Sequence, residues 1–271
     1  MLFFPVSFFS EYDRQVPATK SGRCCYYQHQ TNYMETLKGK QVLITGATGG
    51  IGSRVAKLIS SNGAMVFITG REANKLQQVA RDAGIAAERA LVMDICNETS
   101  VNQAVGQVLA QAPVIDIVVN AAGIGIIKPM DTLRSEEFQL TLQTNLVGAF
   151  YLVKAVLPAM KAQKKGLIVN IPGVLGKVPM AGAAAYSASK YGLTGMMQSI
   201  REELKRTDIR ITNLFLGGVD SPFWDTIDLR VQRDKMIMAE EAAKAIWFLC
   251  QQPISGVVSE MVLQPFNHQA I

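Results

Sequence analysis

A glycine-rich turn, Thr45-Gly-Ala-Thr-Gly-Gly-Ile-Gly52, follows a short apolar run and precedes a stretch with helical spacing. A strand, a tight turn and a helix in this order open a dinucleotide-binding βαβ unit. In that setting Gly46 permits the tight turn, Gly50 lets the backbone approach a pyrophosphate, and Gly52 allows close packing of helix on strand. The amino end of the helix then offers free N–H groups to phosphates. The turn therefore predicts a nucleotide-binding α/β domain.

Short β-rich runs alternate with helical stretches from Lys38 onward. Several runs are apolar at consecutive positions, as expected for strands that are covered on both faces of a parallel sheet. The alternation predicts right-handed crossovers and a single doubly wound, Rossmann-type α/β domain with a mainly parallel seven-stranded sheet. The expected strands are QVLIT at 41, MVFIT at 65, LVMD at 91, IDIVVN at 115, LIVNI at 167, IRITNLF at 209 and EMVLQ at 260, and the expected helices are 51–62, 72–83, 98–110, 135–162, 184–206 and 239–251.

Residues 1–37 carry no pattern of strands or helices. The first nine residues are apolar, but they lack a basic n-region and a small-residue cleavage site, which argues against a secretory signal. We expect residues 38–271 to form the domain. Residues 1–37 are then either a flexible arm or an artefactual extension of the reading frame, with Met34 as a later start.

Charge and composition exclude several classes of function. The net charge of +5 comes from scattered Lys and Arg residues, so no nucleic-acid surface is expected, and an RNA-binding role is the weakest alternative. Two histidines, His29 and His268, are too few for a recognisable metal site. No apolar run reaches the roughly 18 residues of a membrane span. Four cysteines without CxxC spacing fit a reducing cytoplasm.

Tyr186 and Lys190 stand four residues apart in a predicted helix, so their side chains share one helix face. An ammonium group beside a phenol stabilises the phenolate and lowers the pKa of the tyrosine from its usual value of about 10. Such a phenol can exchange a proton with a carbonyl or alcohol oxygen near neutral pH. The pair is a candidate acid/base site.

The end of the second expected strand concerns the choice of dinucleotide. An acidic residue there favours a free ribose 2′-hydroxyl. Here Gly70 is followed by Arg71, whose guanidinium can pair with a 2′-phosphate, so NADP(H) is favoured and NAD(H) stays possible. Glu72 keeps NAD(H) open, since its carboxylate can pair with Arg71 or serve as an acid in the first turn of a helix.

Four motifs together resemble the short-chain dehydrogenase/reductase family over residues 38–271: the T-G-x-x-x-G-x-G turn, Asn120-Ala-Ala-Gly123, Asn145 in TNLVG, and Tyr186-x-x-x-Lys190. The resemblance implies hydride transfer between a nicotinamide and a small carbonyl or alcohol substrate. It makes Tyr186 the acid/base, Lys190 the group that lowers its pKa, and Asn145 the holder of a water that links Lys190 to solvent. An amide that bonds its own neighbours inside a helix is the alternative for Asn145.

The resemblance also implies the cofactor contacts. Asp94 would lie beside the adenine, Asn120 to Gly123 would close the cleft, and Val219 and Ser221 would contact the carboxamide. The whole expected set is Thr45, Gly46, Gly50, Ile51, Gly52, Arg71, Asp94, Asn120, Ala121, Gly123, Tyr186, Lys190, Val219 and Ser221. Leu216 stands where relatives have a proline, and the following residues 223–238 would form a short lid over the substrate or a plain surface helix.

One family residue is missing. A serine thirteen residues before the tyrosine donates a hydrogen bond to the reacting oxygen in relatives, and Gly173 occupies that position here. Neither serine nor threonine occurs from Ile171 through Ala185, so a shift in register does not restore the hydroxyl. Loss of one such donor typically lowers a rate by about 10²- to 10³-fold.

Three explanations for Gly173 remain open. The substrate or a water supplies the contact, Lys177 or another lid residue reaches the site, or the protein binds NADP(H) without turning over ordinary alcohols and ketones. The third explanation makes the chain a catalytically weak or inactive regulatory or scaffold protein. For assembly, the resemblance implies a homodimer or homotetramer through the helices at 135–162 and 184–206, while Gln264–Ile271 replaces the Asp-Gly-Gly ending of relatives.

Overall fold

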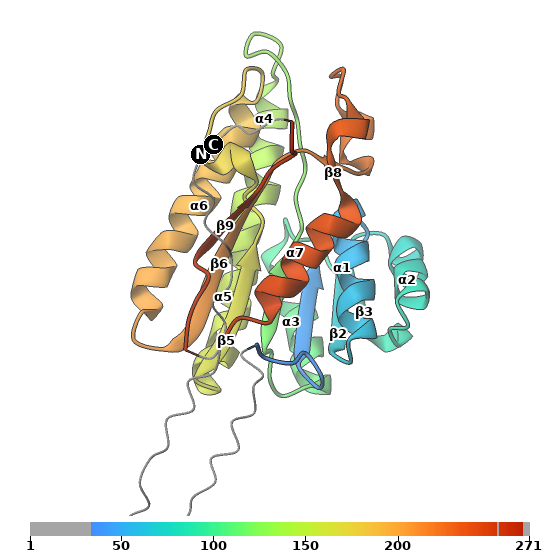
Figure 1. The fold of residues 1–271 in the computed structure, drawn as a ribbon, viewed down its shortest axis with the longest axis vertical. Helices are drawn as coiled ribbons and strands as arrows, with labels where there is room; N and C mark the ends of the chain where they lie inside the picture. The colour runs from blue at the N-terminus through green and yellow to red at the C-terminus, as the bar shows by residue number, and fades with distance from the viewer. Residues whose placement is uncertain (1–33, 254, 268–271) are drawn as a thin grey trace, which may run out of the picture. The chain divides into compact units, whose positions relative to one another are not determined.

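The sheet of the described residues has seven strands, all parallel, in the order β3-β2-β1-β4-β5-β6-β9 (Figure 1). The computed structural model describes residues 34–253 and 255–267. The expected fold class is confirmed. The strands are β1 Gln41–Thr45, β2 Met65–Gly70, β3 Ala90–Val92, β4 Ile117–Asn120, β5 Lys165–Asn170, β6 Asp208–Leu216 and β9 Glu260–Leu263.

The structure does not describe residues 1–33, so most of the predicted arm or extension at residues 1–37 lies outside the described part of the chain. His29, His268, Cys24 and Cys25 lie outside it as well. From Met34 onward the chain leads into β1, and Leu37 is already buried in the core. The division of the chain at residues 37 and 38 therefore stays a prediction.

Helices cover both faces of the sheet and connect its strands. Their bounds are α1 Gly50–Ser61, α2 Ala73–Asp82, α3 Glu98–Gln111, α4 Ser135–Leu142, α5 Gly148–Ala162, α6 Ala184–Leu204 and α7 Ala239–Cys250. Short 3-10 turns lie at η1 Ala87–Arg89, η3 Val174–Gly176, η4 Pro222–Thr226 and η5 Arg233–Lys235. Helix starts and ends fall within two residues of the predicted ones, except that the predicted helix 135–162 contains a π-helical segment, η2 Gln143–Val147.

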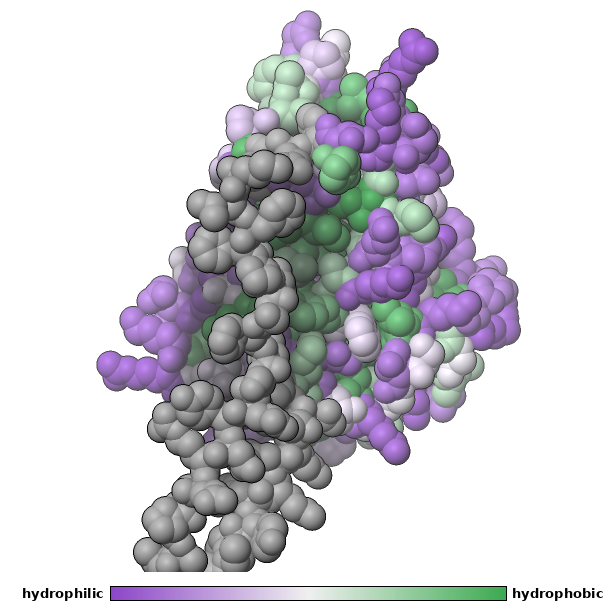
Figure 2. Space-filling model, in the orientation of Figure 1, coloured by the Kyte–Doolittle hydropathy of each residue, from purple (hydrophilic) through white to green (hydrophobic). Residues whose placement is uncertain are grey.

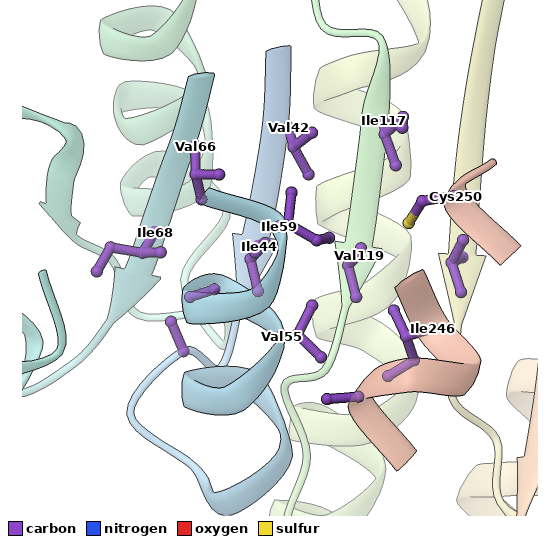
Figure 3. Packing of buried hydrophobic residues seen from close by; sticks show 14 of the residues in the cluster. Val42, Ile44, Val55, Ile59, Val66, Ile68, Ile117, Val119, Ile246 and Cys250 are labelled. Atoms are coloured by element: carbon purple, nitrogen blue, oxygen red, sulfur yellow. The ribbon is translucent and has the colours of Figure 1, made fainter. Parts of the chain in front are cut away.

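Alternate residues of the central strands face opposite helix layers, which explains their consecutive apolar positions. Figure 3 shows one layer, in which side chains of β1, β2 and β4 pack against α1 and α7. The labelled side chains are Val42, Ile44, Val66, Ile68, Ile117, Val119, Val55, Ile59, Ile246 and Cys250. On the other face, Leu43, Val118 and Ile168 pack among residues of α3, α5 and α6. Burial in the first layer raises the pKa of the Cys250 thiol to about 12.

The stretch Ser135–Ala162 is long and apolar enough, by length and composition, to cross a membrane, and it is the one such stretch in the described part of the chain. In the structure Leu152, Val156 and Met160 of this stretch are fully buried against the sheet. The same apolar residues therefore form the core contacts of the second helix layer.

Polar side chains dominate the exposed face of α2, at the right of Figure 1, and Figure 2 shows hydrophilic residues along that edge. The order of the strands reverses between β1 and β4, because β2 and β3 extend the sheet on one side and β5, β6 and β9 on the other. In a doubly wound sheet ligands bind at such a switch point, outside the carboxyl ends of the strands. The carboxyl ends of β1 and β4 are therefore the expected place of a ligand site.

Candidate active site

The glycine-rich turn after β1 has a shape that side chains would obstruct. Gly46 has a φ of +66°, and a Cβ there would lie 2.7 Å from the backbone of Ala121. A Cβ on Gly52 would lie 2.3 Å from the carbonyl oxygen of Gly46. These approaches are too short for any side chain, so the turn needs glycine for its conformation and for helix packing.

The amino end of α1 faces the space above the turn. The residue before α1 is Gly49, so no capping side chain accepts a hydrogen bond from the N–H groups of the first turn. Those donors and the helix dipole fit the pyrophosphate of a dinucleotide. Ser221 lies on the same turn, because a Cβ on Gly50 would meet the Cβ of Ser221 at 2.6 Å. The predicted residues Thr45 to Gly52 and Ser221 are thus brought together.

A row of polar side chains crosses the sheet beside this turn. Thr45, Asn120, Asn170 and Asn213 are in register on β1, β4, β5 and β6, and all four are buried. The Thr45 hydroxyl donates to Oδ1 of Asn120 at 2.9 Å, and Nδ2 of Asn120 donates to Oδ1 of Asn170 at 3.2 Å. The bonds tie the carboxyl ends of the three strands together. Asn170 and Asn213 were not among the predicted site residues, although an asparagine near the end of consecutive buried strands is a usable signal.

Tyr186 and Lys190 come from the first two turns of α6 and lie close together, as their spacing predicts. The Lys190 ammonium is 5.5 Å from the centre of the Tyr186 ring and donates a hydrogen bond of 3.0 Å to the carbonyl oxygen of Ile171. Burial lowers the pKa of Lys190 to about 8 and raises the pKa of Tyr186 above its usual range. Burial therefore opposes the expected lowering of the tyrosine pKa and favours the protonated phenol.

Asn145 lies in the π-helical segment η2, and its side chain is buried. Its Oδ1 accepts from the Ile124 N–H at 2.8 Å, while its Nδ2 donates to the Ile124 carbonyl at 2.9 Å and to the Ser189 hydroxyl at 3.0 Å. These partners are far from it in sequence, so the reading of an amide bonded to its own helix neighbours is wrong. The amide fixes the loop after β4 to α6.

Gly123 lies between this amide and Lys190. A Cβ at Gly123 would lie 3.1 Å from Oδ1 of Asn145 and 3.5 Å from Nζ of Lys190. The expected cleft-closing segment Asn120 to Gly123 and the expected groups Asn145, Tyr186 and Lys190 therefore meet at one place.

A cavity of about 700 Å³ connects the glycine-rich turn to Tyr186. Its wall includes Ile51 of the turn, the segment 121–123, Lys190 and the residues Val219 and Ser221 after β6. Most of its remaining wall is apolar. A mainly apolar cavity with a few convergent polar groups is typical of ligand sites.

Gly173 lies in the wall of the cavity with φ of +72° and ψ of 169°. This backbone conformation is essentially restricted to glycine. A Cβ would find room, with the Leu216 carbonyl oxygen at 3.4 Å, but the backbone would be strained. The loop therefore requires glycine at position 173 for its backbone conformation. The lack of a hydroxyl at this position is a separate consequence of the same residue.

Lys177 does not reach the site. Its ammonium pairs with the Glu260 carboxylate at 2.6 Å and lies 4.4 Å from the centre of the Phe215 ring. The explanation in which Lys177 replaces the missing hydroxyl is therefore wrong for this conformation.

The residues expected around the adenosine lie at the ends of β2 and β3. Arg71 is exposed and makes no ion pair or hydrogen bond within residues 34–253 and 255–267. Glu72 pairs with Lys75 at 2.9 Å, so the considered pairing of Glu72 with Arg71 is not formed. Asp94 is exposed, and its carboxylate accepts from the Cys96 N–H at 3.0 Å. Arg71 is thus available to a ligand at the end of β2.

The segment after β6 folds over the cavity as a lid, which we define as residues 219–238. The strands β7 Val219–Asp220 and β8 Ile237–Met238 pair in parallel and enclose η4 and η5, so the alternative of a plain surface helix is wrong. Phe223 packs 5.8 Å from Tyr186 and 5.3 Å from Trp224, measured between ring centres. The lid therefore supplies an aromatic wall beside the phenol.

Two features anchor the lid. Arg233 donates to the Ser221 carbonyl at 2.7 Å and to the Asp225 carboxylate at 2.6 Å. The indole N–H of Trp224 donates to the Val219 carbonyl at 2.9 Å. The hydrogen bonds hold η4 against β7 and keep the aromatic wall in place.

Among the described residues no cluster of three or more His, Cys, Asp or Glu side chains is arranged to bind a metal ion.

Known proteins resemble this chain over most of its length. The sequence model of the short chain dehydrogenase family matches residues 40–231. An uncharacterized oxidoreductase of Staphylococcus saprophyticus is 30% identical over 235 residues, which cover 86% of this chain and 100% of that protein. A metagenomic short-chain oxidoreductase, solved in complex with NADP, is 30% identical with a TM-score of 0.73 and coverage of 85% and 99%. A 3-ketoacyl-(acyl-carrier-protein) reductase from Brucella melitensis, complexed with NADH, is 27% identical with a TM-score of 0.77 and coverage of 84% and 98%.

Proposed function

The chain belongs to the short-chain dehydrogenase family, and on that premise we propose that it is an NADP(H)-dependent oxidoreductase that interconverts a carbonyl compound and its alcohol. The observation that carries the proposal is the single cavity shared by the glycine-rich turn and the Tyr186 and Lys190 pair. A cofactor on the turn and a substrate at the phenol would both lie in that cavity.

Each group in the cavity has a distinct role in the proposal. The bound nicotinamide supplies hydride transfer to or from the carbonyl carbon. Tyr186 donates its proton to the carbonyl oxygen, and a raised pKa keeps the phenol protonated for that step. Lys190 becomes the source of positive charge that stabilises the phenolate left behind. Asn145 positions the loop after β4. In the proposal it also holds a water that links Lys190 to solvent.

The preference for NADP(H) over NAD(H) depends on Arg71. The guanidinium stands at the end of β2 without an acidic partner in the described part of the chain. A 2′-phosphate offers it charge-assisted hydrogen bonds, whereas a 2′-hydroxyl does not. Solved relatives contain NADP in one case and NADH in another, which supports a nicotinamide cofactor in general.

Gly173 supports a second candidate, a catalytically weak or inactive NADP(H)-binding protein with a regulatory or scaffold role. A loop that needs glycine cannot simply carry the missing serine. Without that donor the developing negative charge on the reacting oxygen is less well stabilised. This candidate predicts cofactor binding without turnover, and capture of a partner that depends on NADPH.

For assembly we propose a homodimer or homotetramer in a reducing cytoplasm. Leu140, Phe150 and Tyr191 of α4, α5 and α6 are large apolar side chains that remain exposed. Cys96 and Cys250 are free thiols. Sedimentation of the purified protein tests the assembly.

The deciding experiment measures NADPH consumption by the purified wild type against aldehydes, ketones, quinones and keto-esters, beside Tyr186→Phe. We expect turnover of at least one class and a loss of about 10²- to 10⁴-fold in kcat for the variant, because general acid catalysis contributes that much. Tyr191→Phe is the matched control, since this neighbouring phenol points to the Lys177 carbonyl. Tight NADPH binding with no turnover of any class would favour the regulatory candidate instead.

A further inference from the structure

The charged side chains that line the cavity beside Tyr186 are all of one sign. Its charged lining residues among those described are Lys190, Arg230 and Lys235, and all three are cations. No aspartate or glutamate of the described ranges lines it. Lys190 is buried near the phenol, whereas Arg230 and Lys235 are exposed side chains of the lid. A binding cavity with this charge favours an anionic ligand.

The two lid cations differ from their neighbour Arg233. Arg233 is neutralised by Asp220 at 3.5 Å and by Asp225 at 2.6 Å. Within the described residues the side chains of Arg230 and Lys235 form no ion pair and no hydrogen bond, neither with these acids nor with Asp228 or Asp234. The lid thus uses its paired arginine to hold its own structure and leaves two charges at the cavity.

The remaining wall suits an apolar body. One side is formed by the segment after Gly173 and the other by the aromatic and aliphatic side chains of the lid. The principal apolar groups are Val174, Leu175, Val178, Met180, Trp224 and Met236. Burial of apolar ligand surface against these groups removes it from water and favours binding.

We infer that this cavity takes an amphipathic anion, in which an apolar body lies along the lid and an acidic group is bound by Arg230 and Lys235. Under the proposed function this anion is the carbonyl substrate, for example an oxo-acid, and in that respect the inference rests on the proposed function. A hydrogen bond to a charged group contributes about 1.5–3 kcal/mol, which corresponds to roughly a 10- to 100-fold change in affinity. The phosphates of the cofactor are the other possible source of the anionic group.

The kinetic test compares an oxo-acid of medium chain length with its methyl ester, at saturating NADPH. The readout is the ratio of kcat/KM for the acid to kcat/KM for the ester. We expect at least 10-fold preference for the acid in the wild type and a ratio near one in the double variant Arg230→Ala/Lys235→Ala. The double variant Arg206→Ala/Lys244→Ala removes two exposed cations that do not line the cavity, and it should keep the wild-type ratio. An equal ratio in wild type and lid variant overturns the inference.

A binding arm needs no turnover. Calorimetry with decanoate and with decanol, in the presence of NADPH, with which neither compound can react, is expected to show at least 10-fold tighter binding of decanoate to the wild type and no preference in the lid variant. NADPH affinity measured on the same variant distinguishes the source of the anion, because a loss there would assign the cations to the cofactor and overturn the inference. Decanoate binding without turnover of any carbonyl compound would refute the proposed function and leave the anion site standing. Turnover that prefers the ester would support the proposed function and overturn the inferred anion site.

Discussion

The Lys190 ammonium donates a hydrogen bond to the carbonyl oxygen of Ile171, two residues before Gly173. The same charge that is proposed to assist Tyr186 therefore also holds the loop in which the family serine is missing. The position of the loop and the proton chemistry of the site are coupled through one side chain. Substitutions of Lys190 should accordingly change stability as well as rate.

Lys190→Met should change how stability depends on pH. The folded-state pKa of about 8 lies below the unfolded value near 10.5, so between pH 8 and 10 the unfolded chain binds one more proton than the folded protein. Stability from this group is absent below pH 8 and rises as pH increases through that window, by about 2 kcal/mol at most. Urea denaturation at pH 8, 9 and 10 measures it as the difference between wild type and Lys190→Met. A difference that stays constant over these pH values would contradict the lowered pKa.

Gly173→Ser should not restore the activity of a serine-bearing relative. Serine at φ of +72° and ψ of 169° is strained, and the cost is of order 1–3 kcal/mol unless the loop changes conformation. We expect lower thermal stability and no increase in kcat. Gly173→Ala carries the same backbone strain without a hydroxyl, so it separates strain from chemistry. A rise in kcat for serine over alanine by about 10²-fold would show that the loop adapts and that the hydroxyl was the missing donor.

Arg71→Ala should weaken NADPH binding and leave NADH binding nearly unchanged. Loss of a charge-assisted contact to the 2′-phosphate corresponds to roughly a 10- to 100-fold higher Kd. Titration with both cofactors measures it, and Lys75→Ala, which removes an exposed cation paired with Glu72, is the control. An equal loss for NADPH and NADH would mean that Arg71 does not discriminate between them.

Gly125→Ala should displace the aromatic wall of the lid. A Cβ at Gly125 would lie 2.1 Å from Cζ of Phe223, so the ring must move away from its place beside Tyr186. We expect a several-fold rise in KM and a shift in the Trp224 emission. The double variant Gly125→Ala/Phe223→Leu relieves the clash, and its KM should lie nearer the Phe223→Leu value than simple addition predicts. Additive effects of the two substitutions on KM would show that Gly125 and Phe223 act independently.

The secondary structure, and the meeting of most candidate site residues at one cavity, followed from local sequence. Periodicity located the strands, and the glycine-rich turn and the Tyr186 and Lys190 spacing located the cavity wall, because those signals act within one turn or one element. The π-helical segment that contains Asn145 was not predicted, since its apolar spacing continues that of the flanking helices. The buried row through Asn170 and Asn213 depends on strand register, which a single chain read in order does not display.

Side-chain partners were harder to predict than positions. Glu72 had two cations within reach, and the structure selects Lys75, one turn along the helix, over its direct neighbour Arg71. Lys177 stands near the cavity in sequence, yet Glu260 at the start of β9 binds its ammonium from 83 positions away. The rise of the Tyr186 pKa likewise depends on burial of the ring in the folded protein, and no motif encodes that.

The backbone conformation at Gly173 also limits how this site can change into one that carries a serine. A chain that carries serine here needs a loop with negative φ, whereas this loop, with Pro172 before it and a left-handed residue at its turn, accepts glycine. A single exchange of glycine for serine therefore places the serine in a strained backbone conformation, and relief of that strain requires a change in the surrounding loop. Mutational paths between the two kinds of site have to pass through a strained intermediate or through several simultaneous replacements.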